Sequence, residues 1–240
     1  MKVILTPILR TLFRPTIEGL ENIPDKGPVI LAPTHLAFCD SVFLPLMVPR
    51  RVTFLAKQEY FTGKGIKGYV TRQFMRGIGM VPLDRTSGSA ARGALETGVR
   101  ILAEGKVLGL YPEGTRSPDG RLYRGKTGVA RLALDAQVPV IPVAMRGTNL
   151  VQPLGRTMPR LHRIRITIGA PLDFSRYDGL SGDRFVERSM TDEIMYELMM
   201  LSGREYVDVY AAKVKLIMDK DGTSAPEAVA RMRNQSTLAA

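Results

Sequence analysis

The chain has 240 residues, and its 34 Lys and Arg against 23 Asp and Glu give a formal net charge of +11. This length corresponds to one α/β domain, and a hydrophobic content of 45% is enough to build a core, which excludes a disordered basic tail. Cys39 is the single cysteine, so no intramolecular disulfide can form, as expected in a reducing compartment. The charge predicts an anionic partner, and nucleic acid, a membrane surface and a phosphorylated substrate are all open.

The first 14 residues combine basic side chains with apolar side chains at helical spacing. Two interpretations are open. The segment is either a short amphipathic helix that lies in the plane of a membrane, or a first helix packed on the domain. Its apolar run is too short for a membrane span, and it has no small-residue cleavage site typical of a signal peptide.

From residue 29 onward, short apolar strands alternate with helical stretches. Strands are predicted at residues 29–32, 52–56, 80–83, 107–111, 138–145 and 163–168. Helices are predicted at residues 38–47, 89–103, 127–136, 183–201 and 204–218, and residues 65–76 are helical or irregular. This alternation predicts an α/β sheet, and the polar residues 219–240 are expected to form a flexible tail.

The segment Tyr-Pro-Glu-Gly-Thr-Arg-Ser at residues 111–117 follows a predicted buried strand, and strand ends are where ligands bind in α/β sheets. Arg116 can bind a phosphate through two N–H groups, and Glu113 can hold that guanidinium or accept a hydrogen bond from a substrate hydroxyl. Gly114 adds flexibility and Thr115 a hydroxyl group. The alternative is a Pro-Glu-Gly turn with an incidental arginine.

A histidine and an aspartate follow the first predicted core strand, five residues apart. His35 is a natural general base near neutral pH, and Asp40 can bond one of its ring nitrogens and stabilise the imidazolium. The alternative is a structural histidine beside a strand. A third strand ends in the pair Asp84 and Arg85, for which the alternative is a surface ion pair.

The carboxyl ends of parallel strands meet at one edge of a sheet, so these three segments are expected to lie together. With the hydrophobic stretch at 138–143, the blocks at 35–40, 79–85 and 111–117 resemble, in order and spacing, the glycerolipid acyltransferases of the 1-acylglycerol-3-phosphate (lysophosphatidate) type. The resemblance covers residues 15–175. It implies an α/β fold with a mixed, largely parallel sheet flanked by helices, and an acyltransferase domain at residues 15–218.

Some positions depart from the family pattern. Thr34 and Ala37 stand where the family commonly has Asn and Ser, Tyr111 replaces Phe, and Pro82 replaces an aromatic or branched residue. The histidine–aspartate pair and both arginine positions are present, so the resemblance implies an active enzyme. The loss of small polar groups beside the histidine is expected to affect the choice of acceptor.

The resemblance implies transfer of a fatty acyl group from acyl-CoA or acyl-carrier protein to the free hydroxyl of 1-acylglycerol 3-phosphate, which forms phosphatidic acid in phospholipid biosynthesis. His35 is the implied general base and Asp40 its partner. Cys39 is expected to be a core residue. The reaction requires no metal and no cofactor beyond the acyl donor.

Substrate binding is also implied by the resemblance. Arg85 and Arg116 are expected to bind the acceptor phosphate, and Glu113 to place the glycerol. Lys57, which follows another predicted strand, and Lys126 are expected to contact the phosphate or the donor.

Two stretches of the chain carry basic residues and no acid: one between Glu59 and Asp84, and one at residues 136–172. The first mixes its basic residues with aromatic and aliphatic ones, as in segments that bind the lipid interface. Together with residues 1–14, they predict a peripheral or monotopic protein at the cytoplasmic face of the cell membrane, on an anionic surface. The alternative is a solvated basic face.

The composition and the motifs also bear on other classes of function. Aromatic residues make up only 7% of the chain and tryptophan is absent, so nucleic acid is not expected as a partner. A non-catalytic module that binds anionic lipids stays open, as does an acyltransferase acting on glycerol 3-phosphate, another lysophospholipid or a glycolipid. A methionine-rich stripe at residues 190–201 is interpreted as helix core packing or as the lining for an acyl chain.

Overall fold

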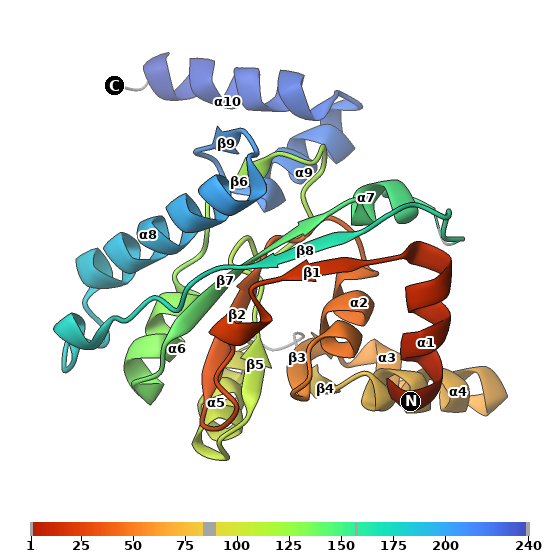
Figure 1. Ribbon diagram of the computed structural model, residues 1–240. Helices are drawn as coiled ribbons and strands as arrows, with labels where there is room; N and C mark the ends of the chain where they lie inside the picture. Colours follow the sequence, from red (N-terminus) through yellow and green to blue (C-terminus); the bar gives the residue numbers. More distant parts are fainter. Residues whose placement is uncertain (1, 84–89, 157, 239–240) are drawn as a thin grey trace.

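The computed structural model describes residues 2–83, 90–156 and 158–238. Within these ranges, a seven-stranded sheet has the order β1-β8-β7-β2-β5-β3-β4, with helices on both faces (Figure 1). Its strands are β1 (Thr16–Glu18), β2 (Val29–Pro33), β3 (Val52–Lys57), β4 (Met80–Leu83), β5 (Val107–Gly109), β7 (Val140–Arg146) and β8 (Arg165–Ile168). A separate pairing joins β6 (Leu122–Tyr123) to β9 (Tyr206–Val207).

Parallel pairing predominates in the large sheet. β2 is parallel to both β5 and β7, and β3 is parallel to both β5 and β4. β1 is parallel to β8, whereas β7 and β8 run antiparallel. The expected mixed, largely parallel α/β sheet is therefore confirmed. Because β2, β5, β3 and β4 run the same way, the segments that follow them leave the sheet at one edge, where open α/β sheets bind ligands.

The helices cover this sheet and extend beyond it. They are α1 (Lys2–Phe13), α2 (Asp40–Met47), α3 (Glu59–Thr62), α4 (Gly65–Gly77), α5 (Ala90–Ala103), α6 (Gly128–Ala136), α7 (Thr148–Val151), α8 (Arg184–Ser202), α9 (Ala211–Asp221) and α10 (Ala225–Leu238). The Asp183 carboxylate caps α8 by accepting hydrogen bonds from two backbone N–H groups. Gly203, with φ at 61°, ends α8 in the left-handed conformation that glycine adopts readily, and the chain then enters β9.

A hydrophobic core forms on each face of the sheet, because side chains alternate along a strand. In β2, Val29 and Leu31 belong to one core, and Ile30 and Ala32 belong to the other. The first core is covered by α1, α2 and α4, and the second by α5, α6 and α8, which lie on opposite sides of the sheet in Figure 1. The methionine-rich stripe of α8 supplies buried residues to the second core, which confirms core packing for those residues: Met190, Ile194, Met195 and Leu198.

A third, smaller cluster joins β6 and β9 to α9 and α10. Its buried members are Tyr123, Val207, Ala211, Val214, Ala225, Ala228 and Val229. The prediction of one helix over residues 204–218 is wrong at its start, since β9 pairs with β6 and α9 begins only at Ala211. Strands of two residues exist through their pairing rather than through a pattern of their own, so the sequence does not reveal them.

The prediction of a flexible tail at residues 219–240 is also wrong over the part that the structure describes. Residues 225–238 form α10, and Ala225, Ala228 and Val229 bury one face of it at helical spacing. Two of these three side chains are alanines, which carry little hydrophobic signal. Their small size nevertheless lets α10 pack on the third cluster.

Helix α1 packs on the domain. The rings of Phe13 and Phe43 meet edge to face with centroids 5.2 Å apart, and Thr6 Oγ1 donates a hydrogen bond to a backbone oxygen of α2 at 3.2 Å. Ile8 and Leu12 are 47% and 50% exposed, so a membrane contact by residues 1–14 stays a prediction. Over the described residues, no helix combines the length and apolar character that crossing a bilayer requires.

Candidate active site

His35 follows β2 at the carboxyl edge of the sheet, and Asp40 begins α2. His35 Nδ1 lies 3.0 Å from Asp40 Oδ2, so the predicted pair forms. The same oxygen accepts hydrogen bonds from the backbone N–H groups of Leu36 at 2.7 Å and Ala37 at 2.8 Å. The Asp40 side chain is buried, while that of His35 is 15% exposed. These bonds hold the carboxylate, and through it the imidazole, in one orientation.

Tyr111 supports the other side of the imidazole. Its ring stacks on His35 with centroids 3.7 Å apart and planes 13° from parallel. Its hydroxyl lies 2.6 Å from Ser41 Oγ, and burial raises the pKa of Tyr111 well above its usual value, so this hydroxyl is neutral. From the sequence, Tyr111 is only a replacement for phenylalanine. The contact with His35 depends on the pairing of β2 with β5.

The side chain of Glu113 lies against the backbone of His35, and the residue is 1% exposed. Its Oε1 accepts a hydrogen bond from the His35 backbone N–H at 3.3 Å, and its Oε2 accepts one from the Tyr123 backbone N–H at 3.0 Å. Burial raises the pKa of Glu113 to about 7, although these hydrogen bonds favour the charged form. The carboxyl group therefore ties the His35 segment, the loop after β5 and β6 together. The predicted contact of Glu113 with the glycerol stays a prediction.

The turn at residues 114–116 lies beside His35 because both of its ends are tied to that residue. The carboxyl group just before the turn accepts the His35 N–H, and Ser117 N–H donates to His35 O at 2.7 Å. Gly114 has φ at 70°, a conformation that favours glycine. A Cβ at this position would also meet the side chain of Lys126 at 3.1 Å. The backbone conformation therefore favours glycine here, and a larger residue would also displace the flexible end of the Lys126 side chain.

Three cationic side chains surround this turn. Arg116 and Lys126 are exposed, as expected for groups that bind a substrate. The third was not indicated by the sequence: Lys215 of α9 donates a hydrogen bond from Nζ to Thr115 Oγ1 at 3.0 Å. Among the described residues, none of the three cations forms an ion pair with an acid. The turn is therefore a place of concentrated positive charge next to the histidine.

Arg204 is a second residue that the sequence does not indicate. Its Nη2 donates a hydrogen bond to Met145 O at 2.5 Å, and burial lowers its pKa, against the opposing effects of Glu113 and Asp40. Within the described part of the chain, Arg204 Nη1 and Asp40 Oδ1 are buried without a hydrogen-bond partner. The guanidinium thus offsets the negative charge of the two carboxyl groups behind His35.

Two further basic residues, Lys57 and Arg85, are predicted to contact the substrate. Lys57 ends β3 and is exposed at the same edge of the sheet. Arg85 and its neighbour Asp84 lie outside the described residues, so their role stays a prediction.

Cys39 is buried, as expected for a core residue, and its Sγ donates to Thr148 O at 3.6 Å. Burial raises the pKa of Cys39 to about 12, so the thiol stays protonated and is a poor nucleophile.

These observations define a class of protein: a layered α/β fold with a histidine–aspartate pair and a basic turn at the carboxyl edge of its sheet. The sequence model of the family described as Acyltransferase matches residues 14–146, more than half of the chain. The chain therefore belongs to the acyltransferase family. The matched segment contains β2, α2 and the basic turn, and it ends with β7, before Arg204 and α9.

Curated relatives bear the name 1-acyl-sn-glycerol-3-phosphate acyltransferase. The chloroplastic protein of Arabidopsis thaliana is 31% identical over 173 residues, which cover 71% of this chain and 47% of the relative. The Bacillus subtilis protein is 29% identical over 158 residues, or 65% of this chain and 72% of the relative. The chain spans about half the length of the chloroplastic relatives from Arabidopsis thaliana and Brassica napus.

A solved structure shares the fold. The crystal structure of the 1-acyl-sn-glycerophosphate acyltransferase PlsC from Thermotoga maritima matches with a TM-score of 0.59 and 23% identity, over 85% of this chain and 82% of that one. The likeness extends past the segment matched by the family model, and it concerns the arrangement of strands and helices.

Proposed function

We propose that this chain transfers a fatty acyl group from an acyl thioester, acyl-CoA or acyl-carrier protein, to the free hydroxyl of 1-acylglycerol 3-phosphate, forming phosphatidic acid. The observation that carries the proposal is the partly exposed imidazole of His35, held 3.0 Å from the buried carboxylate of Asp40 beside a basic turn. The names of the relatives support the choice of acceptor. The proposed reaction uses no metal and no cofactor beyond the acyl donor.

In this mechanism His35 is the general base. Nδ1–H donates to Asp40, which leaves Nε2 to take the proton of the acceptor hydroxyl. The hydroxyl oxygen forms a bond to the thioester carbonyl carbon, and the resulting tetrahedral intermediate then loses the thiolate as the C–S bond breaks. The imidazolium returns its proton to the thiolate sulfur. Asp40 stabilises the imidazolium in the interval between the two proton transfers.

The basic residues around the turn have the role of binding the phosphate of the acceptor. In this proposal Arg116 binds it at the turn, since charge-assisted hydrogen bonds from a guanidinium to a phosphate are strong and directional. Lys126, whose side chain covers Gly114, contributes a second charge. Arg85 and Lys57 belong to the same proposal, because β4 and β3 are neighbouring strands that end at this edge.

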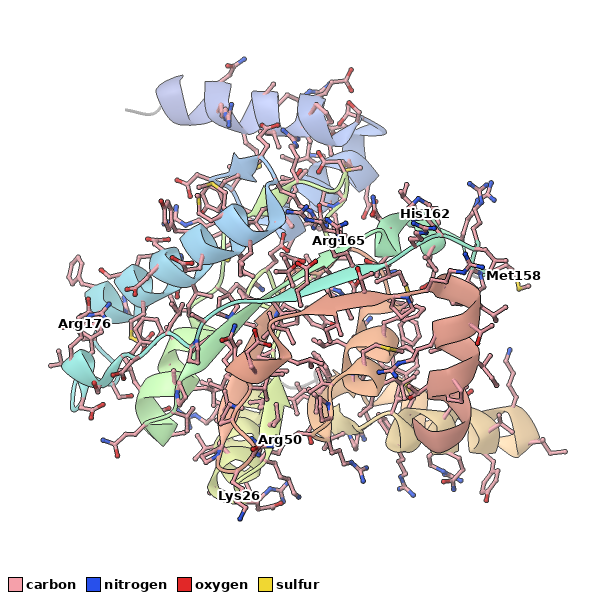
Figure 2. The ribbon with its side chains drawn as sticks, viewed as in Figure 1. Lys26, Arg50, Met158, His162, Arg165 and Arg176 are labelled. Atoms are coloured by element: carbon pink, nitrogen blue, oxygen red, sulfur yellow. The ribbon has the colours of Figure 1, made fainter. Side chains whose placement is uncertain are left out.

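We also propose that the protein binds an anionic membrane peripherally or monotopically, at the cytoplasmic face of the cell membrane. On α4, Ile66 is 86% exposed and lies beside the exposed Lys67. Met158, which is 80% exposed, projects from the segment after α7 on the same flank as α1 (Figure 2). Exposed apolar and basic groups together favour interfacial binding. Sedimentation with phosphatidic acid vesicles, but not with phosphatidylcholine vesicles, is the expected result.

The decisive experiment is the substitution His35→Ala, assayed by release of thiol from acyl-CoA in the presence of lysophosphatidate. Removing a general base lowers kcat by about 10²- to 10⁴-fold. His162→Ala is the matched control, because His162 is exposed and its Nδ1 lies 2.8 Å from the backbone oxygen of its neighbour Arg163 rather than beside a carboxylate. A rate for His35→Ala equal to that of the wild type would show that the imidazole is not the base. A wild-type protein that binds lysophosphatidate without turnover would favour the lipid-binding module.

A further inference from the structure

Helix α9 brings a basic side chain to the turn at residues 114–116 from a distant part of the chain. Lys215 Nζ donates a hydrogen bond to Thr115 Oγ1 at 3.0 Å, and its side chain is partly buried. One residue before it, Val214 is fully buried in the third cluster, so the backbone from which the lysine extends is well anchored. Helix α9 follows the segment that the family model matches.

The charges around this lysine leave it without an ion-pair partner in the described part of the chain. Burial lowers the pKa of Lys215 and the nearby Arg116 lowers it further, while Glu113 and Asp219 act in the opposite direction. Glu113 is an ineffective counter-ion, because both of its oxygens accept backbone hydrogen bonds and its pKa is about 7. Asp219 is exposed, one turn further along α9. Cations held close together in this way are suited to a doubly charged anion.

We propose that Lys215 acts with Arg116 and Lys126 as the binding site for a phosphate monoester of the substrate, an inference that rests on the proposed acyltransferase function. An ammonium group has three N–H donors, so Lys215 can keep its bond to Thr115 and still donate to a phosphate oxygen. The hydrogen bond to Thr115 restricts the flexible side chain before substrate arrives. This preorganisation lowers the entropic cost of binding.

The position of the turn fits the geometry of the proposed acceptor. Backbone hydrogen bonds tie the turn to His35 at both ends, so a phosphate bound there lies near the general base. In 1-acylglycerol 3-phosphate, the carbon bearing the free hydroxyl is bonded directly to the carbon bearing the phosphate ester. The short separation of these two groups matches the short separation of the base and the turn. Coenzyme A also carries a phosphate monoester, on its ribose, so the test must separate the two sources.

The test compares Lys215→Met with Lys213→Met, which removes the charge of an exposed lysine on the same helix. Lys215→Met is expected to raise a substrate KM about tenfold or more, the loss typical of one hydrogen bond to a charged group, with a smaller effect on kcat. Lys213→Met is expected to leave both constants unchanged. Lys215→Arg keeps the charge, so it should restore much of the affinity and shows that the protein still folds.

The arms of the experiment identify the phosphate. A rise in KM for lysophosphatidate alone assigns the site to the acceptor, and a rise in KM for acyl-CoA alone, absent with acyl-pantetheine, assigns it to the ribose phosphate. Unchanged KM values for both substrates, or an equal effect of Lys213→Met, would overturn the inference. Binding of glycerol 3-phosphate, measured by calorimetry on wild type and Lys215→Met, tests the site without turnover. If acyl transfer itself is absent, the loss of this binding in the variant still supports the site while the proposed function fails.

Discussion

The His35–Asp40 pair and the basic turn at residues 114–116 are neighbours at the sheet edge. The pair is held by contacts between residues close in the sequence, whereas the turn is held by contacts between distant segments. The pair is held by hydrogen bonds within six consecutive residues, from the end of β2 to the first residue of α2. The turn is held by His35, by β6 and by Lys215 of α9. The reactive group of this site is therefore built locally, whereas its charge environment is assembled by the fold.

This contrast has a consequence for energetics. The hydrogen bonds of the local pair form whenever β2 and α2 form, so changes in α9 and the third cluster should leave the geometry of the pair intact. The turn depends on the third cluster, which positions α9, and on Glu113, which links the two regions. Perturbing the distant elements should therefore affect substrate binding and pH dependence more than the chemical step.

The strongest test of the local half is Asp40→Asn. An amide cannot stabilise the imidazolium or hold the same tautomer, so kcat is expected to fall by about 10²- to 10⁴-fold. Steady-state kinetics on the purified variant measure this loss, with circular dichroism to check folding. If the pair acts as one unit, the double variant with His35→Ala is no slower than His35→Ala alone. Losses that multiply in the double variant would show that the two residues act separately.

Glu113, which joins the two regions, should give the chain a characteristic pH dependence of stability. Its pKa is 4.5 as a free side chain and about 7 in the folded protein, so the folded state binds more protons between these values. The free energy of unfolding therefore falls as pH rises from about 4.5 to 7, by at most about 3 kcal/mol from this group. Urea unfolding of wild type and Glu113→Gln across this range measures the difference.

The wild type serves as the control, because it and Glu113→Gln share all other titrating groups. Any pH-dependent difference in their stability therefore comes from Glu113. The gap in unfolding free energy between Glu113→Gln and wild type should shift in favour of the variant as pH rises. A gap that is constant from pH 4.5 to 8 would mean that Glu113 has an ordinary pKa.

Arg204→Met tests whether a distant cation tunes the site. The variant removes the positive charge that interacts with Glu113 and Asp40, so the pKa of Glu113 should rise above about 7. Stability is expected to fall by about 1–3 kcal/mol, because the hydrogen bond to Met145 O is also lost. Arg131→Met is the matched control, since Arg131 forms a surface pair with Asp135 and should change stability by less than about 1 kcal/mol. An equal fall in the free energy of unfolding in both variants would show that Arg204 contributes no more than a surface arginine.

The smallest expected effect comes from the third cluster. Val214→Ala loosens the packing of α9 and should destabilise the protein by about 1–2 kcal/mol. Because α9 carries Lys215, the KM for lysophosphatidate should rise about two- to threefold, while kcat stays within a factor of two. Thermal unfolding and steady-state kinetics measure the two effects. A fall in kcat with an unchanged KM would contradict the separation between the local pair and the assembled turn.

Much of the fold could be predicted because its signals are local. Strand β2 is a short apolar run buried on both faces, and α6 and α8 carry apolar residues at helical spacing. The elements that were missed have no such signal. Strand β9 has two residues and exists through its pairing with β6, and α10 buries alanines.

The reactive pair, the segment at 113–116 and most of the longer strands and helices follow from the sequence, because each lies within one short window of the chain. Only the folded chain stacks Tyr111 on His35, brings Lys215 to Thr115 and places the charge of Arg204 near the two buried carboxyl groups. Those contacts join segments that only the folded sheet and the packing of α9 bring together. Their strength depends on burial, which no single segment specifies.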